Sequence, residues 1–210
     1  MKALYLLAAV PLVVMSHVQP AAADTKELIS ALKQGGYVLV FRHGATDESQ
    51  KDIYPFKFDD MSAQRQLSDK GRDMAREMGA AIKKLGIPVG EVYTSRLNRA
   101  VETGKLLAGK DVNAVDALTD SSAGSTTGMA NPTGGNAKAG AAVRRLVDAA
   151  PKSGTDTFLV THKPNIVDAF GKAASDVEEG EALVYKASAS GSAILVGRIK
   201  ASEWTAKAAN

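Results

Sequence analysis

The chain has 210 residues, a formal net charge of +3 at pH 7 and no cysteine. Without cysteine it has no disulfide, no thiolate nucleophile and no cysteine-ligated zinc site. The small net charge argues against a polybasic surface for nucleic acid or for membranes.

The first 23 residues predict a secretory signal segment. Lys2 precedes an apolar stretch over residues 3–15, and the alanines at 21–23 supply an A-x-A cleavage site. The apolar stretch is short for a membrane-spanning helix, and Pro11 interrupts it. We therefore expect cleavage, a periplasmic or secreted protein, and no stable membrane insertion afterwards. An uncleaved N-terminal anchor is the alternative.

The mature chain, residues 24–210, has the length of a single domain and can bury a core without disulfides or metal. Apolar strands alternate along it with amphipathic helical segments, which predicts a three-layer α/β/α sandwich around a mostly parallel central sheet. The predicted elements in chain order are a helix over 25–34, a strand over 37–41, helix 68–85, strand 91–94, helix 96–107, edge strand 111–115, helix 137–150, strand 155–161, helix 164–173, and two closing strands over 181–186 and 192–199.

Two long segments, 45–66 and 121–136, have no clear periodicity. Loops of this length within a compact domain are usually functional. The composition of the first segment suits a second anionic or ring-bearing substrate group, and equally suits a packed surface loop. The side chains in question are Lys51, Lys57 and Arg65 with Tyr54, Phe56 and Phe58.

The first predicted strand ends in Arg42, His43 and Gly44. Because His17 lies in the predicted signal segment, the mature protein keeps only His43 and His162 as histidines. An isolated Arg-His-Gly is a weak signal. Its arginine can pair with a surface acid while its histidine caps a loop.

The segment 93–104 runs from a predicted strand into a predicted helix whose first turn contains Arg99. Unpaired N–H groups at a helix start suit an anion, and the planar guanidinium matches phosphate oxygens in pairs. The alternative is an ordinary solvated helix in which Arg96, Arg99 and Glu102 pair with one another at i,i+3 spacing.

The strand over 155–161 leads directly to His162. On its own, this histidine is as easily a buried, structurally satisfied residue. However, parallel strands bring their carboxyl ends to one edge of the sheet, where α/β proteins bind ligands. That edge would gather Arg42, Arg99 and both histidines into a cationic pocket, with no carboxylate supplied by the motifs. A phosphoryl group is the anion that fits best.

Taken in order, these motifs resemble those of the histidine phosphatase superfamily, also called the phosphoglycerate mutase-like family. The resemblance runs from about residue 36 to residue 166 and arguably into the last strands. The matching blocks are Phe41-Arg42-His43-Gly44-Ala45-Thr46, Gln66-Leu67-Ser68-Asp69-Lys70-Gly71, Thr94-Ser95-Arg96-Leu97-Asn98-Arg99-Ala100-Val101-Glu102-Thr103 and Val160-Thr161-His162.

The resemblance implies that His43 is a nucleophile that forms a phosphohistidine, and that Arg42, Arg99 and His162 hold the phosphoryl oxygens. It implies a metal-independent phosphomonoester hydrolase with a small phosphorylated substrate and no cofactor. Histidine is an accepted covalent nucleophile. Because the attacking imidazole must be neutral, we expect a backbone hydrogen bond to its other ring nitrogen.

A general acid must also protonate the leaving oxygen. In the common branch of the family a glutamate does so, in a Leu-x-Glu pattern, and Asp120 stands in its place here. Asp47 and Asp116 are further candidates, and an N-cap or turn role is the alternative for all three. Lys163 follows the second histidine and either contacts substrate or points to solvent.

Other classes fit less well. The sequence has no Walker-type phosphate loop, and the carboxylates Asp47, Asp52, Asp59 and Asp60 are too scattered to indicate a metal site. Two alternatives remain, a non-catalytic protein that binds or senses an exported phosphate ligand on the same fold, and a phosphomutase. The sequence indicates neither the substrate nor the oligomeric state.

Overall fold

A mixed sheet organises the computed structural model, which describes residues 24–119, 136–188 and 191–209. The strands of this part of the chain are β1 (Tyr37–Arg42), β2 (Val89–Thr94), β3 (Asn113–Ala114), β4 (Asp156–Thr161), β5 (Ala182–Lys186) and β6 (Ile194–Ile199). Their order is β3-β2-β4-β1-β5-β6. The pairs β1–β4, β2–β4 and β2–β3 are parallel, whereas β5 is antiparallel to β1 and to β6. The prediction of a mostly parallel sheet is confirmed.

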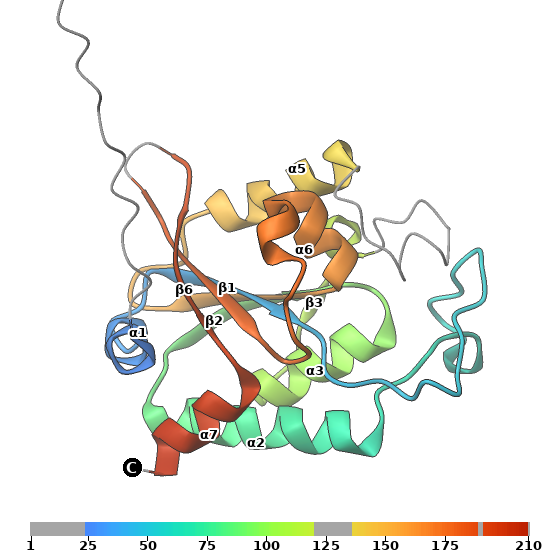
Figure 1. Ribbon diagram of the computed structural model, residues 1–210, viewed down its shortest axis with the longest axis horizontal. Coiled ribbons are helices and arrows are strands. Elements are labelled where there is room, and N and C mark those ends of the chain that lie inside the picture. Colours follow the sequence, from blue (N-terminus) through green and yellow to red (C-terminus); the bar gives the residue numbers. More distant parts are fainter. Residues whose placement is uncertain (1–23, 120–135, 189–190, 210) are drawn as a thin grey trace, which may run out of the picture.

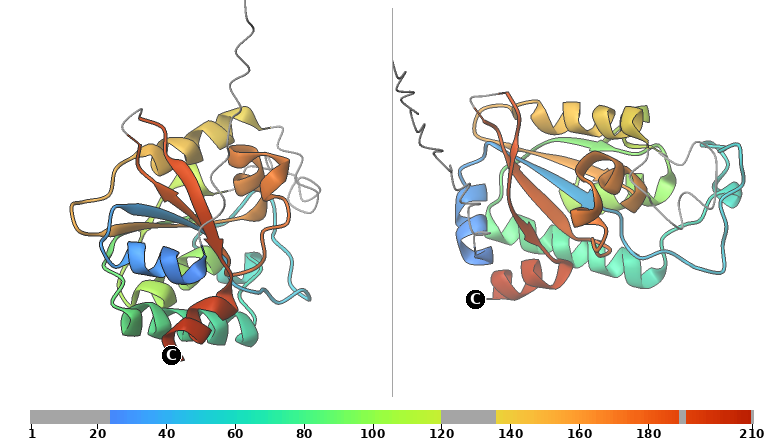
Figure 2. Two further views of the ribbon diagram at one scale, coloured as in Figure 1. Left: turned by 60° about the vertical axis from the view of Figure 1, so that its left-hand side comes forward. Right: turned by 45° about the horizontal axis from the view of Figure 1, so that its top comes forward.

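Helices cover both faces of this sheet and complete the predicted three-layer sandwich (Figure 1, Figure 2). The helices are α1 (Thr25–Leu32), α2 (Asp69–Leu85), α3 (Asn98–Ala108), α5 (Ala137–Asp148), α6 (Lys163–Phe170) and α7 (Ala201–Ala209), with short 3-10 turns at Met61–Ala63, Asp116–Leu118 and Lys172–Ala174. One apolar cluster joins α1, α2, α3 and α7 to the sheet, and a second joins α5 and α6 to its other face. Within the described ranges, no helix has both the length and the apolar character to cross a membrane.

β1 lies inside the sheet and contributes side chains to the apolar clusters on both of its faces. Its side chains alternate, with Val38 and Val40 in the cluster under α5 and α6, and Leu39 and Phe41 in the cluster on the opposite face. All four are fully buried. A strand covered on both faces reads as a continuous apolar run, which explains why it was recognisable in the sequence.

Each predicted strand and helix has a counterpart, with ends shifted by a few residues. The long helix α2 begins and ends at capping residues that are recognisable in the sequence. The Ser68 side chain caps its start by accepting from the Gly71 N–H (3.1 Å), and Gly86 ends it with a φ of 73°. The C-terminal helix α7 was not predicted. Its anchor is Trp204, which is fully buried with its ring centroid 6.5 Å from that of Phe41.

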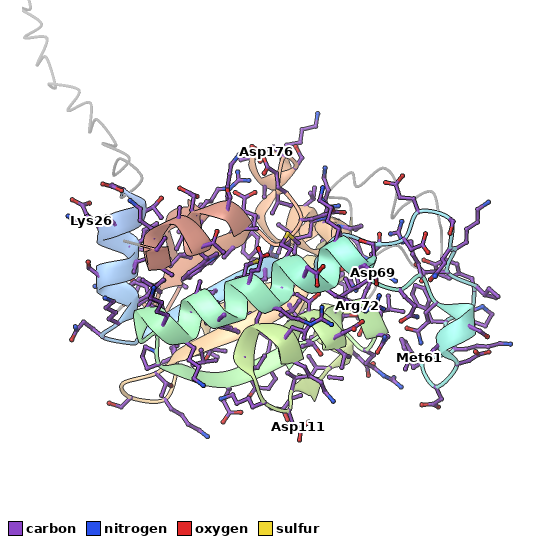
Figure 3. All side chains as sticks on the ribbon, turned by 90° about the horizontal axis from the view of Figure 1, so that it is seen from below. Lys26, Met61, Asp69, Arg72, Asp111 and Asp176 are labelled. Carbon is purple, nitrogen blue, oxygen red and sulfur yellow. The ribbon has the colours of Figure 1, made fainter. Side chains whose placement is uncertain are left out.

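The carboxyl ends of β1, β2 and β4 share one edge of the sheet, because these strands are parallel. The 45–66 loop, residues 45–66 after β1, projects beyond this edge (Figure 1). Met61 lies far out on that loop, and Lys26 of α1 lies near the opposite end of the molecule (Figure 3). His43 and His162, which directly follow β1 and β4, therefore lie where the chain leaves the sheet and enters this loop.

A buried carboxyl group lies at the other end of β4. Asp156 is fully buried, its Oδ1 accepts from the Tyr37 N–H (2.9 Å), and its Oδ2 has no partner among the described residues. Burial raises the pKa of Asp156 to about 7.

We expect Asp156 to make the fold less stable as the pH rises. Between pH 4 and pH 7 the folded state holds a proton that the unfolded state has lost, so the free energy of unfolding falls with pH. In urea titrations at pH 5 and pH 8, Asp156→Asn should gain about 2 to 3 kcal/mol relative to the unmodified protein across that interval. A difference between the two proteins that does not change with pH would contradict this.

Candidate active site

His43 lies directly beyond β1. Its backbone N–H donates to the Thr161 carbonyl of β4 (3.0 Å), which extends the ladder by one residue and fixes the histidine at the sheet edge. The side chain is buried, and Nδ1 lies 2.7 Å from the Gly44 carbonyl oxygen. A carbonyl only accepts, so the proton is on Nδ1 and Nε2 keeps its lone pair. The expected backbone hydrogen bond to the imidazole is confirmed.

His162 lies beyond β4, and its ring centroid is 5.1 Å from that of His43. Its Nε2 is 2.8 Å from the Ser95 hydroxyl, while its buried Nδ1 has no partner among the described residues. Burial, reinforced by the charge of Arg99, lowers the pKa of both histidines well below the usual range. Both imidazoles are therefore neutral at neutral pH.

Arg42, the last residue of β1, is held by two acceptors. Its Nη1 donates to the Val177 carbonyl (2.9 Å), and its Nη2 pairs with Glu179 (3.2 Å). Its Nε is buried and has no partner in the described part of the chain. The guanidinium is thus held through both terminal nitrogens, and its Nε–H is left without an acceptor.

Arg99, in the first turn of α3, is fully buried. Its Nη1 donates to Asp52 (2.9 Å) and to the Arg65 carbonyl (3.3 Å). Its Nε and Nη2 are buried without partners among the described residues. These two nitrogens form one edge of the guanidinium, the fork that matches two oxygens of a phosphoryl group.

The ordinary-helix interpretation of this segment is wrong. Arg99 pairs with Asp52, Arg96 pairs with Asp116 (3.0 Å), and Glu102 pairs with another helix. The partner of Glu102 is Arg72 of α2 (2.8 Å), labelled in Figure 3. The three side chains therefore pair with different parts of the molecule, and of the three only Arg99 adds to the lowered pKa of His43 and His162.

The 45–66 loop is packed against the start of α3. The Gln64 side-chain oxygen accepts from the Asn98 N–H (2.9 Å), and Arg96 stacks over the Phe58 ring at 4.0 Å. Tyr54 and Phe56 contact one another, with ring centroids 4.3 Å apart. The packed-loop interpretation therefore accounts for the aromatic side chains of the loop.

A pocket of about 620 Å³ opens over the two histidines. Its residues come from β1, from the 45–66 loop and from the start of α6, and they are Arg42, His43, Glu48, Gln50, Lys51, Asp52, Arg65, His162, Lys163 and Pro164. Lys163 thus lies at the pocket. Asp52 and Glu48 were not singled out for the site, because neither belongs to a motif and only the folded loop brings them there. No group of three or more His, Asp or Glu side chains in the described ranges is arranged to hold a metal ion.

The proton-donor candidates lie apart from this pocket or outside the description. Asp47 is occupied by Ser49 and Gln50, and the hydrogen bonds from Ser49 lower its pKa. Asp116 is exposed and pairs with Arg96. Neither carboxylate lines the pocket. Asp120, the first choice, lies outside the described residues.

Close backbone contact holds the chain just after His43 in place. A side chain at Gly71 of α2 would put its Cβ 2.0 Å from the Ala45 carbonyl oxygen. The Gly44 N–H donates to Thr103 of α3 (3.1 Å). The motif glycine at 71 is therefore required by the approach of α2 to the segment that carries the nucleophile candidate.

We expect Gly71→Ala to displace this segment and lower kcat/KM for an aryl phosphate by about 100-fold, the cost of a shift near 1 Å. Gly79→Ala, also in α2, is the matched control, because its Cβ would lie 2.2 Å from the Leu106 carbonyl of α3, and Gly79 does not line the pocket. Both variants should lose about 1 to 3 kcal/mol of stability. Equal kinetic losses in the two folded variants would contradict a specific role for Gly71.

The chain is similar to known proteins both in sequence pattern and in fold. The family model described as histidine phosphatase superfamily (branch 1) matches residues 38–144. No curated protein sequence matches at a significant level. Among solved structures, YhfR of Bacillus stearothermophilus superposes with a TM-score of 0.56 at 16% identity, over 77% of this chain and 95% of that one.

Two further structures show the same fold. The protein histidine phosphatase SixA, complexed with tungstate, gives a TM-score of 0.54 at 16% identity, over 79% of this chain and 97% of that one. A phosphoserine phosphatase of Entamoeba histolytica, complexed with phosphoserine, gives a TM-score of 0.53 at 14% identity, over 80% of this chain and 98% of that one. The edge of the sheet where β1, β2 and β4 end is therefore part of a shared architecture.

Proposed function

The chain belongs to the histidine phosphatase superfamily, and from this premise we propose that it hydrolyses phosphomonoesters through a phosphohistidine at His43. The observation that carries the proposal is the hydrogen bond between Nδ1 of His43 and the Gly44 carbonyl. It leaves a lone pair on Nε2 of a neutral imidazole that lines a pocket rich in guanidinium groups. A neutral nucleophile beside fixed cations is suited to attack on a phosphoryl group.

In the first step, the Nε2 lone pair of His43 forms the N–P bond while the P–O bond to the leaving group breaks. The leaving oxygen takes a proton. In the second step, water attacks phosphorus and loses a proton, the N–P bond breaks, and Nε2 regains its lone pair. Arg42 and Arg99 balance charge on the phosphoryl oxygens, so we propose that the reaction needs no added metal.

His162 is proposed to donate to a phosphoryl oxygen through Nδ1. Ser95 Oγ lies 2.8 Å from Nε2 of His162 and also accepts from the Leu97 N–H (3.1 Å), and we assign its hydroxyl proton to Nε2. That places the His162 proton on the unpartnered Nδ1. A bound phosphoryl group would supply the missing acceptor.

The direct test is turnover of 4-nitrophenyl phosphate by the mature protein in excess chelator, with alkaline quenching to trap the phosphoenzyme. We expect turnover and a phosphoprotein that is stable in alkali and labile in acid. Binding of phosphate without turnover would favour the non-catalytic alternative. Turnover only after metal is added would contradict metal independence.

Asp120 is proposed as the general acid, from its place in the motif order. Asp120→Asn should then slow hydrolysis of alkyl phosphates far more than that of 4-nitrophenyl phosphate, because a good leaving group needs little protonation. Rates on the two substrates, measured side by side, check this. An equal loss on both would argue against the role.

The substrate is proposed to be a small phosphomonoester met outside the cytoplasm. The related structures were solved with tungstate or phosphoserine, which are a phosphate mimic and a small phosphorylated ligand. The export proposal rests on the predicted signal segment over residues 1–23, which lies outside the described residues. N-terminal sequencing of protein from a periplasmic or culture fraction should begin at Asp24.

A further inference from the structure

Arg65 differs from Arg42 and Arg99 because its charge has no partner among the described residues. It lines the pocket, and its Nε is buried without a hydrogen bond. In the described part of the chain, Arg65 takes part in no ion pair, whereas Arg42 has Glu179 and Arg99 has Asp52. Arg65 is half-buried, but its buried Nε–H cannot reach water, so an acceptor from outside the protein is expected at this atom.

The backbone of Arg65 is fixed on both sides. Its N–H donates to Oδ1 of Asp52 (3.0 Å), and its carbonyl accepts from Nη1 of Arg99 (3.3 Å). The same Asp52 oxygen accepts from Arg99 (2.9 Å). Asp52 thus ties the 45–66 loop to α3 and sets Arg65 and Arg99 next to each other.

The Arg65 charge is close enough to act on every other candidate group. Burial is the main cause that lowers the pKa of His43 and His162, and the charge of Arg65 adds to it at both. Burial likewise leads in lowering the pKa of Arg42 and Arg99, and the same charge contributes there. The Arg65 guanidinium is thus near enough to act on all four groups, in keeping with its place among the residues that line the pocket.

We propose that Arg65 is a third phosphoryl-binding guanidinium, supplied by the 45–66 loop in addition to Arg42 and Arg99. Its Nε–H binds an oxygen of the same phosphoryl group that reacts with His43. The inference takes from the proposed function only that the bound group is phosphoryl. It predicts that assembly of the phosphate site depends on the fold of the 45–66 loop, through Asp52.

The test is calorimetric binding of inorganic phosphate to the full mature protein and to Arg65→Gln, Arg65→Lys and Lys57→Gln. Lys57 is exposed on the same loop and does not line the pocket, so its variant controls for lost positive charge. Arg65→Gln should weaken phosphate binding about 10- to 100-fold, the range of a hydrogen bond to a charged group. Arg65→Lys should give a smaller loss, and Lys57→Gln should match the unmodified protein.

Kinetics and thermal unfolding separate the outcomes. For 4-nitrophenyl phosphate, the KM of Arg65→Gln should rise with the Kd for phosphate, at an unchanged melting temperature. An unchanged Kd for phosphate in Arg65→Gln would overturn the inference. This holds also if the same variant weakens the binding of substrates that carry a second anionic group. If the unmodified protein binds phosphate but does not turn over, the proposed function fails, and a weakened Kd in Arg65→Gln still supports the inference.

Discussion

Replacing His43 by alanine is expected to abolish the phosphoenzyme and to lower kcat for 4-nitrophenyl phosphate by about 10⁴- to 10⁶-fold, as loss of a nucleophile does in other covalent enzymes. The physical reason is the Nδ1 hydrogen bond to Gly44, which leaves Nε2 of His43 as a free lone pair at the pocket. The nearest imidazole, His162, has its own Nε2 on Ser95 (2.8 Å) and is not placed to substitute. Rapid alkaline quenching with a labelled substrate measures the covalent species directly.

The fold should tolerate this change. Among the described residues, the side chain of His43 is hydrogen-bonded only to the carbonyl of its neighbour Gly44, so truncation leaves no distant group there unpaired. Phosphate binding should survive in His43→Ala, because the guanidinium groups of Arg42 and Arg99 remain. His162→Ala is the matched comparison, and it should still form the phosphoenzyme at a reduced rate. Undiminished phosphoenzyme in His43→Ala, or its complete absence in His162→Ala alone, would reverse the assignment.

Neutral histidines also fix the sign of the pH dependence. Because burial and nearby arginines lower the pKa of His43, the nucleophile stays unprotonated well below pH 6.5. The acidic limb of kcat/KM should therefore lie below the usual titration range of histidine. The arginines proposed to hold the phosphoryl group thus also help to keep the proposed nucleophile unprotonated.

The fold, and the position of Arg42, His43 and His162 at one edge of the sheet, could be predicted from the sequence for a shared reason. β1 and β4 are buried on both faces, so their apolar runs are unbroken and their ends are sharp. Parallel strands then send the residues that follow them to one edge, which is how His43 and His162 come to lie with ring centroids 5.1 Å apart. Arg99 was found through the strand-to-helix junction that precedes it.

The 45–66 loop could not be predicted in the same way. It has neither helical nor strand periodicity, and its fold depends on side-chain contacts such as Gln64 with Asn98. The pairing of Asp52 with Arg99 joins residues 47 positions apart. No local pattern specifies such a pair. For that reason the sequence offered Arg65 only as one loop cation among three.

This difference has a functional meaning. The sheet edge supplies the proposed nucleophile and the proposed phosphoryl-binding groups, whereas the 45–66 loop supplies the acceptors that hold Arg99 and part of the pocket wall. Loops carried on a rigid sheet are where specificity usually varies within one fold. Substrate choice in this protein is therefore expected to depend on the 45–66 loop.

Replacing Arg99 by lysine is expected to lower kcat/KM for 4-nitrophenyl phosphate by about 10²- to 10³-fold, although the charge is kept. Lysine cannot supply the two parallel donors that Nε and Nη2 of Arg99 hold free, nor bind Asp52 and the Arg65 carbonyl at the same time. Because the Arg99 side chain is fully buried, water cannot take the place of the N–H donors that lysine lacks. Steady-state kinetics and the Kd for inorganic phosphate measure the loss.

Two variants show whether the loss comes from the guanidinium fork. Arg96→Lys changes an arginine three residues earlier that pairs with exposed Asp116 and lies over the Phe58 ring. A lysine can keep both contacts, so this variant should keep kcat/KM within about 2-fold. Asp52→Asn keeps an acceptor for Arg99 and the Arg65 N–H, so its loss should be smaller than that of Arg99→Lys. If Arg99→Lys retained full activity, positive charge alone would suffice at this position. The orientation imposed by the 45–66 loop would then have no part in catalysis.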